Sequence, residues 1–296
     1  MEETKKISFR QKNQIVCPVC RNEFYREEMF TGSGRLIAEK LTDELRRLYK
    51  ESQKFGKIYP LVYMLNVCPS CLYTAYPKDF TDISEAEIEK LKEMKPARKS
   101  IFEKFFGDQN FNDDRNLMLG AASYMLAVDC YNFRKKNVAP TFKRGVSSIR
   151  AAWLFSDLAE EYPDKSYKKI SLFFYKKAYE FYTRILDLLQ SGAEPADAAG
   201  NMGPDSDKNW GYEGILYVSA VLTYKFGTSE KDIDKKIEDF NVSKRYCSRL
   251  FGSGKTSKTT PTELLEKTRI LYEKLNQTLE QWESGKEEKE EKEENI

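Results

Sequence analysis

The stretches QIVCPVC (residues 14–20) and NVCPSC (residues 66–71) repeat one CPxC motif. Each motif is short enough to form a tight turn that directs two sulfurs towards one ion, and two such turns supply the four thiolates of a tetrahedral zinc site. The proline shared by the two motifs and the strand-type residues before them are unlike a chance arrangement of cysteines. We therefore predict a metal site whose ligands are Cys17, Cys20, Cys68 and Cys71.

The sequence specifies the four cysteines more tightly than it specifies the metal or the role of the thiols. Iron accepts the same four-thiolate geometry as zinc, and a dithiol redox pair or four buried small side chains are alternatives to a metal site. Four protein thiolates leave no position free for water, as in structural rather than catalytic zinc sites. We expect a structural Zn²⁺ ion, with iron as the alternative metal.

The segment between the two motifs, residues 21–67, is longer than the roughly 15 to 20 residues that separate the pairs of a zinc ribbon. Apolar residues recur at mostly helical spacing between Leu36 and Lys50, which predicts a helical insertion there. The stretch PLVYMLNVCPSC (residues 60–71) is rich in β-branched and aromatic residues and predicts a strand that leads into the second motif. Residues 1–80 would then form a small zinc-ribbon-like module that the metal holds together.

The rest of the chain has the periodicity of helices. Ser84 and Glu87 have the spacing of a capping box, and Thr260 and Pro261 stand where the last helix should begin. Further helical segments, joined mostly by short linkers, are expected at residues 116–135, 142–162, 166–189, 210–226 and 233–250. The predicted fold is mainly α: after the N-terminal module, residues 81–283 form an all-α helical-hairpin array that is loosely tetratricopeptide-like, and residues 284–296 form a disordered charged tail.

Other segments carry weaker signals. Residues 191–209 are rich in Gly, Pro, Ala and Asp and predict an exposed or disordered loop, and Cys130 and Cys247 are expected in the core. The aromatic residues Phe173, Phe174, Phe181 and Tyr182 are also expected in the core. In FGSGKTSKT (residues 251–259), Arg249 stands where a phosphate-binding loop needs its first glycine, so we interpret the segment as a linker.

Composition excludes several classes of function. The chain has no histidine, so serine and cysteine hydrolases that use a histidine base, as well as HExxH peptidases, are ruled out. The net charge is +2, and residues 1–80 carry only four more basic than acidic side chains, a small excess for a nucleic-acid surface. No apolar stretch is long enough to span a bilayer and no apolar signal sequence is evident, so we expect a cytoplasmic protein without membrane contact.

The N-terminal CPxC motif, the stretch from Tyr63 to Tyr76 and the helical remainder resemble a bacterial family known as domain of unknown function 2225. The resemblance extends over about residues 13 to 280, and it is strongest where the family has NVCP followed by a CGYA-like continuation. Here Leu72 replaces the glycine. The family has no established activity, so the resemblance implies only that the four cysteines are metal ligands.

Three classes of function remain at this stage. The first is a protein-interaction adaptor, in which the helical array binds a protein or peptide partner. The second is an enzyme whose site in the helical part uses carboxylates or tyrosine. The third is a nucleic-acid-binding zinc ribbon whose phosphate contacts would come from Lys5, Lys6, Arg10, Lys12, Arg21 and Arg26. We favour the adaptor.

Overall fold

The computed structural model describes residues 5–32, 34–227, 232–252 and 261–294, with side chains as far as residue 284 in the last range. The chain divides into two compact units. The first comprises residues 1–42, 46–200 and 205–207, and the second comprises residues 43–45, 201–204 and 208–296. Among the described residues, no helix combines the length and apolar character that a bilayer crossing requires.

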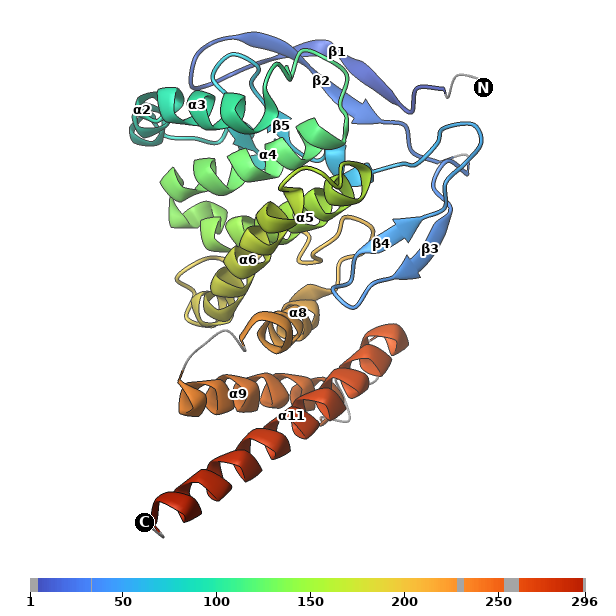
Figure 1. The fold of residues 1–296 in the computed structure, drawn as a ribbon. Helices are drawn as coiled ribbons and strands as arrows, with labels where there is room; N and C mark the ends of the chain where they lie inside the picture. The colour runs from blue at the N-terminus through green and yellow to red at the C-terminus, as the bar shows by residue number, and fades with distance from the viewer. Residues whose placement is uncertain (1–4, 33, 228–231, 253–260, 295–296) are drawn as a thin grey trace. The chain divides into compact units, whose positions relative to one another are not determined.

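The first unit begins with short antiparallel strand pairs (Figure 1). Strand β1 pairs with β2 and contains an irregularity between Arg10 and Gln14, β3 pairs with β4, and β5 pairs with β6. A 3₁₀ helix, η1, lies between β4 and β5 in the chain. The bounds are β1 Ser8–Val16, β2 Glu23–Met29, β3 Ala38–Leu41, β4 Arg47–Tyr49, η1 Pro60–Tyr63, β5 Asn66–Val67 and β6 Thr74–Ala75.

Two local predictions for this region are wrong. The segment from Leu36 to Lys50 is the β3–β4 hairpin rather than a helix, because Leu45 adopts a left-handed φ of 61° that interrupts a helix. In addition, the backbone N–H of Arg47 donates to Asp205 rather than to a helical carbonyl. The strand predicted over residues 60–71 is also shorter than expected. Residues 60–63 form the 3₁₀ helix η1, which begins at Pro60, and only β5 is a strand.

The helices of the first unit follow the sequence prediction closely. Asn116 caps α4 by accepting a hydrogen bond from Leu119 N–H at 2.8 Å, and Ser84 with Glu87 forms the predicted capping box of α2. Helices α4, α5 and α6 pack in sequence against one another (Figure 1). The helical elements are α1 Pro77–Phe80, α2 Glu85–Glu93, α3 Lys95–Phe106, α4 Leu117–Cys130, η2 Tyr131–Phe133, η3 Lys136–Val138, α5 Pro140–Glu161, α6 Tyr167–Gln190 and α7 Ala196–Ala199.

Stacked aromatic rings form much of the helical core. Phe155 of α5 contacts Phe106 of α3 and Phe174 of α6, with ring centroids 6.1 and 5.6 Å apart. The predictions that Phe174, Phe181, Tyr182, Cys130 and Cys247 are core residues are confirmed. Phe173 is different, because 53% of it is exposed and it lies on the outer side of α6.

The loop at residues 191–209 is held to the protein more firmly than its composition predicts. Glu194 is 3% exposed and accepts hydrogen bonds from the N–H groups of Thr141 and Phe142 at the start of α5. Asp205 is 2% exposed and accepts from Arg47 N–H at 2.8 Å. The loop therefore has exposed positions, such as Ser191 and Asn201, but two buried carboxylates anchor it by accepting hydrogen bonds from backbone N–H groups.

The second unit contains α8 (Gly211–Phe226), α9 (Ile233–Gly252) and α11 (Thr262–Glu294). Trp282 of α11 packs on Phe240 of α9 with ring centroids 4.6 Å apart.

The predicted N-cap of α11, Thr260, lies outside the described residues. Helix α11 continues to Glu294, although the sequence predicts disorder from residue 284 onward, because Glu and Lys are good helix formers. The sequence predicts a buried stripe on α11 made of Leu264, Thr268, Leu271, Leu275, Leu279 and Trp282. The first five are at most 5% exposed, whereas Trp282 is only partly buried.

The mainly helical class with a small N-terminal strand region is thus confirmed. The likeness to tetratricopeptide repeats stays a prediction. So does the boundary near residue 81, because it states that the N-terminal module and the helical array fold independently.

Candidate metal centre

The two CPxC motifs form turns with the same hydrogen-bonding pattern. In the first, Cys17 N–H donates to Asn22 O and Arg21 N–H donates to Cys17 O, both at 2.9 Å. In the second, Cys68 N–H donates to Tyr73 O and Leu72 N–H donates to Cys68 O, again at 2.9 Å. The repeated sequence motif is therefore a repeated local structure, placed between β1 and β2 in one case and between β5 and β6 in the other.

The residue after the second cysteine has a left-handed backbone in both turns. Arg21 has φ 63° and Leu72 has φ 60°. This conformation is costly for residues other than glycine, and it closes the turn so that the two cysteines of each motif face the same side. It also explains why a glycine suits the position that Leu72 occupies.

The four sulfurs form one cluster. Cys17 Sγ lies 3.6 Å from Cys71 Sγ, Cys20 Sγ lies 3.5 Å from Cys68 Sγ, and all four lie within 4.8 Å of one another. A tetrahedron with Zn–S bonds of 2.3 Å has edges of roughly 3.8 Å. The cysteines are free thiols, and three of them are buried while Cys20 is partly buried. The donor set and its size fit a tetrahedral metal ion.

Electrostatics around the sulfurs favour a bound cation. Hydrogen bonds from Cys17 and Cys71 lower the pKa of the Cys68 thiol, while the contact with Cys68 raises the pKa of Cys17 and the contact with Cys17 raises the pKa of Cys71. Without a cation, Cys68 thus loses its proton readily, whereas Cys17 and Cys71 retain theirs. A divalent metal removes this conflict, because it stabilises all four thiolates together.

Arg98 of α3 lies directly behind the second turn. It is 2% exposed, and its Nη2 donates to Leu91 O at 2.6 Å and to Cys71 O at 3.4 Å. The nearest carboxylate oxygen in an ion pair with it, from Asp129, is 3.9 Å away, and its Nε and Nη1 have no hydrogen-bond partner. A buried cation with so little compensation is costly unless a negative group lies close by. A tetrathiolate zinc site carries two negative charges and would provide that group.

Helix α4 supports the second turn from another side. Tyr124 donates its hydroxyl to Leu61 O at 2.8 Å, and Thr74 N–H donates to Cys130 Sγ at 3.4 Å. An added Cβ at Gly120 would approach Val62 Cγ2 to 2.6 Å, so η1 packs directly on the helix backbone. Sequence reasoning identified none of these supports, because nothing local to Arg98, Tyr124 or Gly120 relates them to the cysteines.

Several of the basic side chains considered for nucleic-acid contact form ion pairs within the protein. Asp114 forms ion pairs with Lys6 at 2.6 Å and Arg10 at 3.5 Å, and Arg26 pairs with Glu28 at 3.2 Å. Hence three of the six basic side chains considered for nucleic-acid contact already have carboxylate partners. Asp205 and Asp207 both accept hydrogen bonds from Arg47, the first from its backbone N–H and the second from its Nε. Residues 253–260 of the linker FGSGKTSKT lie outside the described residues.

Comparison with known proteins shows the family of the chain. The model of the family described as "Uncharacterized protein conserved in bacteria (DUF2225)" matches residues 11–275. The chain belongs to this family. It is also 40% identical, over 275 residues that cover 93% of this chain and 98% of the relative, to an "Uncharacterized protein" of Borreliella burgdorferi. No solved structure matches the chain. The family match includes both CPxC motifs and the helices that pack behind them.

Proposed function

We propose that Cys17, Cys20, Cys68 and Cys71 bind one structural Zn²⁺ ion. The observation that carries this proposal is the convergence of four thiol sulfurs within 4.8 Å on two turns of identical hydrogen bonding. Bound there, zinc would cross-link the two turns, much as a disulfide framework does in secreted proteins. With four thiolate ligands and no histidine in the chain, the ion would have no position for an activated water.

Metal content tests this proposal directly. Four thiolates bind one metal ion, so we expect elemental analysis of the purified chain to find about one metal ion per molecule, and that ion to be zinc rather than iron. Cys68→Ser should lose most of the metal, whereas Cys247→Ser, which removes a buried thiol of the second unit, should retain it. Equal amounts of zinc in wild type and in the Cys17→Ser/Cys68→Ser double variant would rule the site out.

The wider function that we propose is that of a cytoplasmic adaptor for a protein partner. The free cysteines are typical of a reducing compartment. The helices α3 and α6 expose large apolar side chains of the kind that protein interfaces bury, namely Ile101, Phe105, Leu172 and Phe173, each at least 42% exposed. These side chains would form the partner surface of the helical part.

Affinity purification with the zinc-loaded full chain tests the adaptor role. We expect a protein that is enriched by the wild type, lost with Leu172→Ser/Phe173→Ser and retained with Lys168→Ser/Lys169→Ser on the same helix. Recovery of the same proteins by all three baits would contradict the proposal.

The other two classes of function have less support. Ion pairs occupy Lys6, Arg10 and Arg26, which reduces the charge available for phosphates. For an enzyme, one polar cluster to consider is Lys143 with Asp79 and Tyr131, but all three are at most 5% exposed and so are closed to a substrate. Their ion pair and hydrogen bond fit a structural role in the core.

A further inference from the structure

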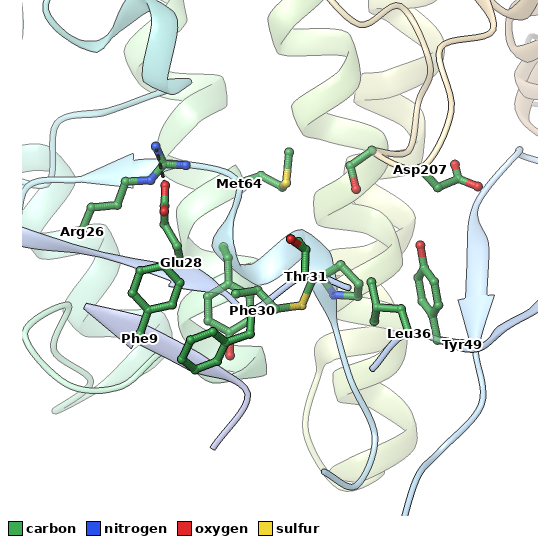
Figure 2. A pocket seen from close by; sticks show the side chains of 13 residues that line it. Phe9, Arg26, Glu28, Phe30, Thr31, Leu36, Tyr49, Met64 and Asp207 are labelled. Carbon is green, nitrogen blue, oxygen red and sulfur yellow. Dashed lines mark ion pairs between the residues drawn. The ribbon is translucent and has the colours of Figure 1, made fainter. Parts of the chain in front are cut away.

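Several arginine side chains of the first unit are paired with carboxylates of the same chain. The cavity of about 640 Å³ beside the β1–β2 hairpin shows this (Figure 2). Arg26 in its wall pairs with Glu28 at 3.2 Å, and Asp207 in its wall pairs with Arg47 at 3.1 Å. The three charged residues of the wall are thus neutralised within the protein, and they indicate no charged ligand.

Arg98 of α3 lacks such a partner at short range. Its side chain is 2% exposed, yet its Nε and Nη1 make no hydrogen bond within the described part of the chain. The ion pair that it forms with Asp129 is long, at 3.9 Å, and this Asp129 oxygen also has no hydrogen-bond partner there. A buried guanidinium with so little compensation lowers stability unless other groups favour its position.

The hydrogen bonds of the Arg98 side chain connect three parts of the first unit. Its Nη2 donates to Leu91 O near the end of α2 at 2.6 Å and to Cys71 O in the second cysteine turn at 3.4 Å. Arg98 itself belongs to the start of α3. One side chain therefore joins the turn that contains Cys68 and Cys71 to both α2 and α3.

Helix α3 has a buried and an exposed face. Arg98, Phe102 and Phe106 are at most 7% exposed, and the two rings pack with centroids 5.4 Å apart. Phe106 also contacts α5, so the C-terminal half of α3 has an apolar anchor, whereas Arg98 fastens the N-terminal half to the cysteine turn. The exposed face carries Ile101 and Phe105 of the proposed partner surface.

We infer that metal binding at the cysteines controls how the N-terminal half of α3 packs, with Arg98 as the residue that connects the two. With zinc bound, the second turn holds Cys71 O in place for Arg98, and the thiolates supply the negative charge that Arg98 lacks. Without zinc, this half of α3, which carries Ile101, would leave the turn more often, so the metal would regulate part of the partner surface. By linkage, packing of α3 would in return raise the affinity for zinc by the same factor. The inference rests on the proposed metal site.

The test is hydrogen exchange of the full chain, followed by mass spectrometry, before and after zinc is removed with a chelator. Metal analysis of each preparation comes first. Residues 91–102 include the contacts of Arg98, and α6, which packs on α5, is the internal reference. Arg98→Met removes the charge and the hydrogen bonds but keeps an unbranched side chain, and Arg98→Lys keeps the charge. Lys99→Met is the matched control, because Lys99 is the next residue of α3 and is partly exposed.

We expect chelation to speed exchange at residues 91–102 of the wild type about 10-fold and to leave α6 unchanged. Arg98→Met should lose this response and bind zinc about 10-fold more weakly in competition with a chelator, because the connection is broken. Arg98→Lys should keep part of the response, and Lys99→Met should keep all of it.

An unchanged exchange rate at residues 91–102 after zinc is removed from the wild type would overturn the inference while leaving the metal site intact. A response of full size in Arg98→Met, or equally faster exchange in α6, would overturn it as well. The wild-type comparison requires no variant, so it decides the inference even if Arg98→Met fails to fold. Wild type that contains no metal would instead refute the proposed site, and the inference with it.

Discussion

Arg21 illustrates how a single backbone angle supports the metal site. Its φ of 63° closes the first CPxC turn, and its side chain is exposed. Replacement by glycine removes the steric cost of the left-handed conformation without removing a buried contact. We predict that Arg21→Gly raises the free energy of unfolding of the zinc-loaded protein by about 0.5 to 1 kcal/mol, as measured by urea denaturation.

The matched control is Asn22→Gly, at the next residue, where φ is not positive. There the added freedom of the unfolded chain should lower stability. An increase in stability for both variants, or for neither, would show that the angle at residue 21 is not strained.

Glu87 carries a pH dependence of stability. Although burial by itself raises the pKa of Glu87, hydrogen bonds from Ser84, from Lys135 N–H and from Arg134 lower it to about 2. A carboxylate whose pKa is lower in the folded than in the unfolded state stabilises the fold above the unfolded pKa. This stabilisation is lost as the pH falls from about 4.5 to about 2, and we expect it to amount to about 2 kcal/mol.

The measurement is urea unfolding of wild type and Glu87→Gln at pH 7 and at about pH 3, within that window. Wild type should be more stable than the variant at pH 7, and the difference should shrink at the lower pH. A difference that is independent of pH would mean that Glu87 stabilises the fold through shape rather than charge.

Among the elements, the contact of η1 with α4 fixes the approach to the second cysteine turn. The Cβ of an alanine at Gly120 would lie 2.6 Å from Val62 Cγ2 and 3.2 Å from Val62 Cα, so the backbone of η1 must move. We predict that Gly120→Ala lowers the free energy of unfolding by about 1 to 3 kcal/mol, even though alanine is the better helix former. Thermal or urea denaturation measures this loss.

Gly145 on α5 is the comparison, because there the added Cβ meets the tip of Ile185, 2.8 Å away, which can turn aside. Gly145→Ala should therefore cost less than Gly120→Ala. Adding Val62→Ala should cost less in the Gly120→Ala background than in wild type, since it removes the clashing methyl groups. Additive effects of the two substitutions would contradict a direct clash.

The elements also show what the sequence could and could not predict. Long amphipathic helices such as α5 and α6 were predicted to within two residues at each end, because their periodicity extends over many turns. The β3–β4 hairpin was predicted as a helix, because the contact that sets its geometry, Arg47 N–H with Asp205, joins residues far apart in the sequence. The buried Glu194 and Asp205 went unrecognised for the same reason.

At the scale of the whole molecule, metal removal should affect the two units differently. The cysteine turns belong to the first unit, and no ligand lies in α8, α9 or α11. We predict that chelation of zinc accelerates hydrogen exchange at residues 15–24 and 60–76, while α8 keeps its protection and most of the helical circular dichroism remains.

The boundary near residue 81 is tested by the same data. Faster hydrogen exchange restricted to residues 1–80 would agree with a separate module. Equally faster exchange in α4, α5 and α6 would show that the first unit unfolds as one cooperative structure. Loss of protection in α8 together with the cysteine turns would contradict the predicted independence of the second unit.

The candidate site was more accessible to sequence reasoning than its surroundings. Two copies of CPxC define both the clustered cysteines and the turn geometry locally, whereas Arg98 and Cys130 approach the second turn only in the folded chain.

X-ray absorption at the zinc edge of the purified full chain tests the central claim most directly, because it reports the atoms bound to the metal. The four-cysteine site predicts about four sulfur neighbours at roughly 2.3 Å and no oxygen or nitrogen neighbour. In Cys68→Ser, any residual zinc should show fewer sulfur neighbours. A wild-type spectrum that requires an oxygen or nitrogen ligand, or one unchanged in the variant, would contradict a closed structural site built from Cys17, Cys20, Cys68 and Cys71.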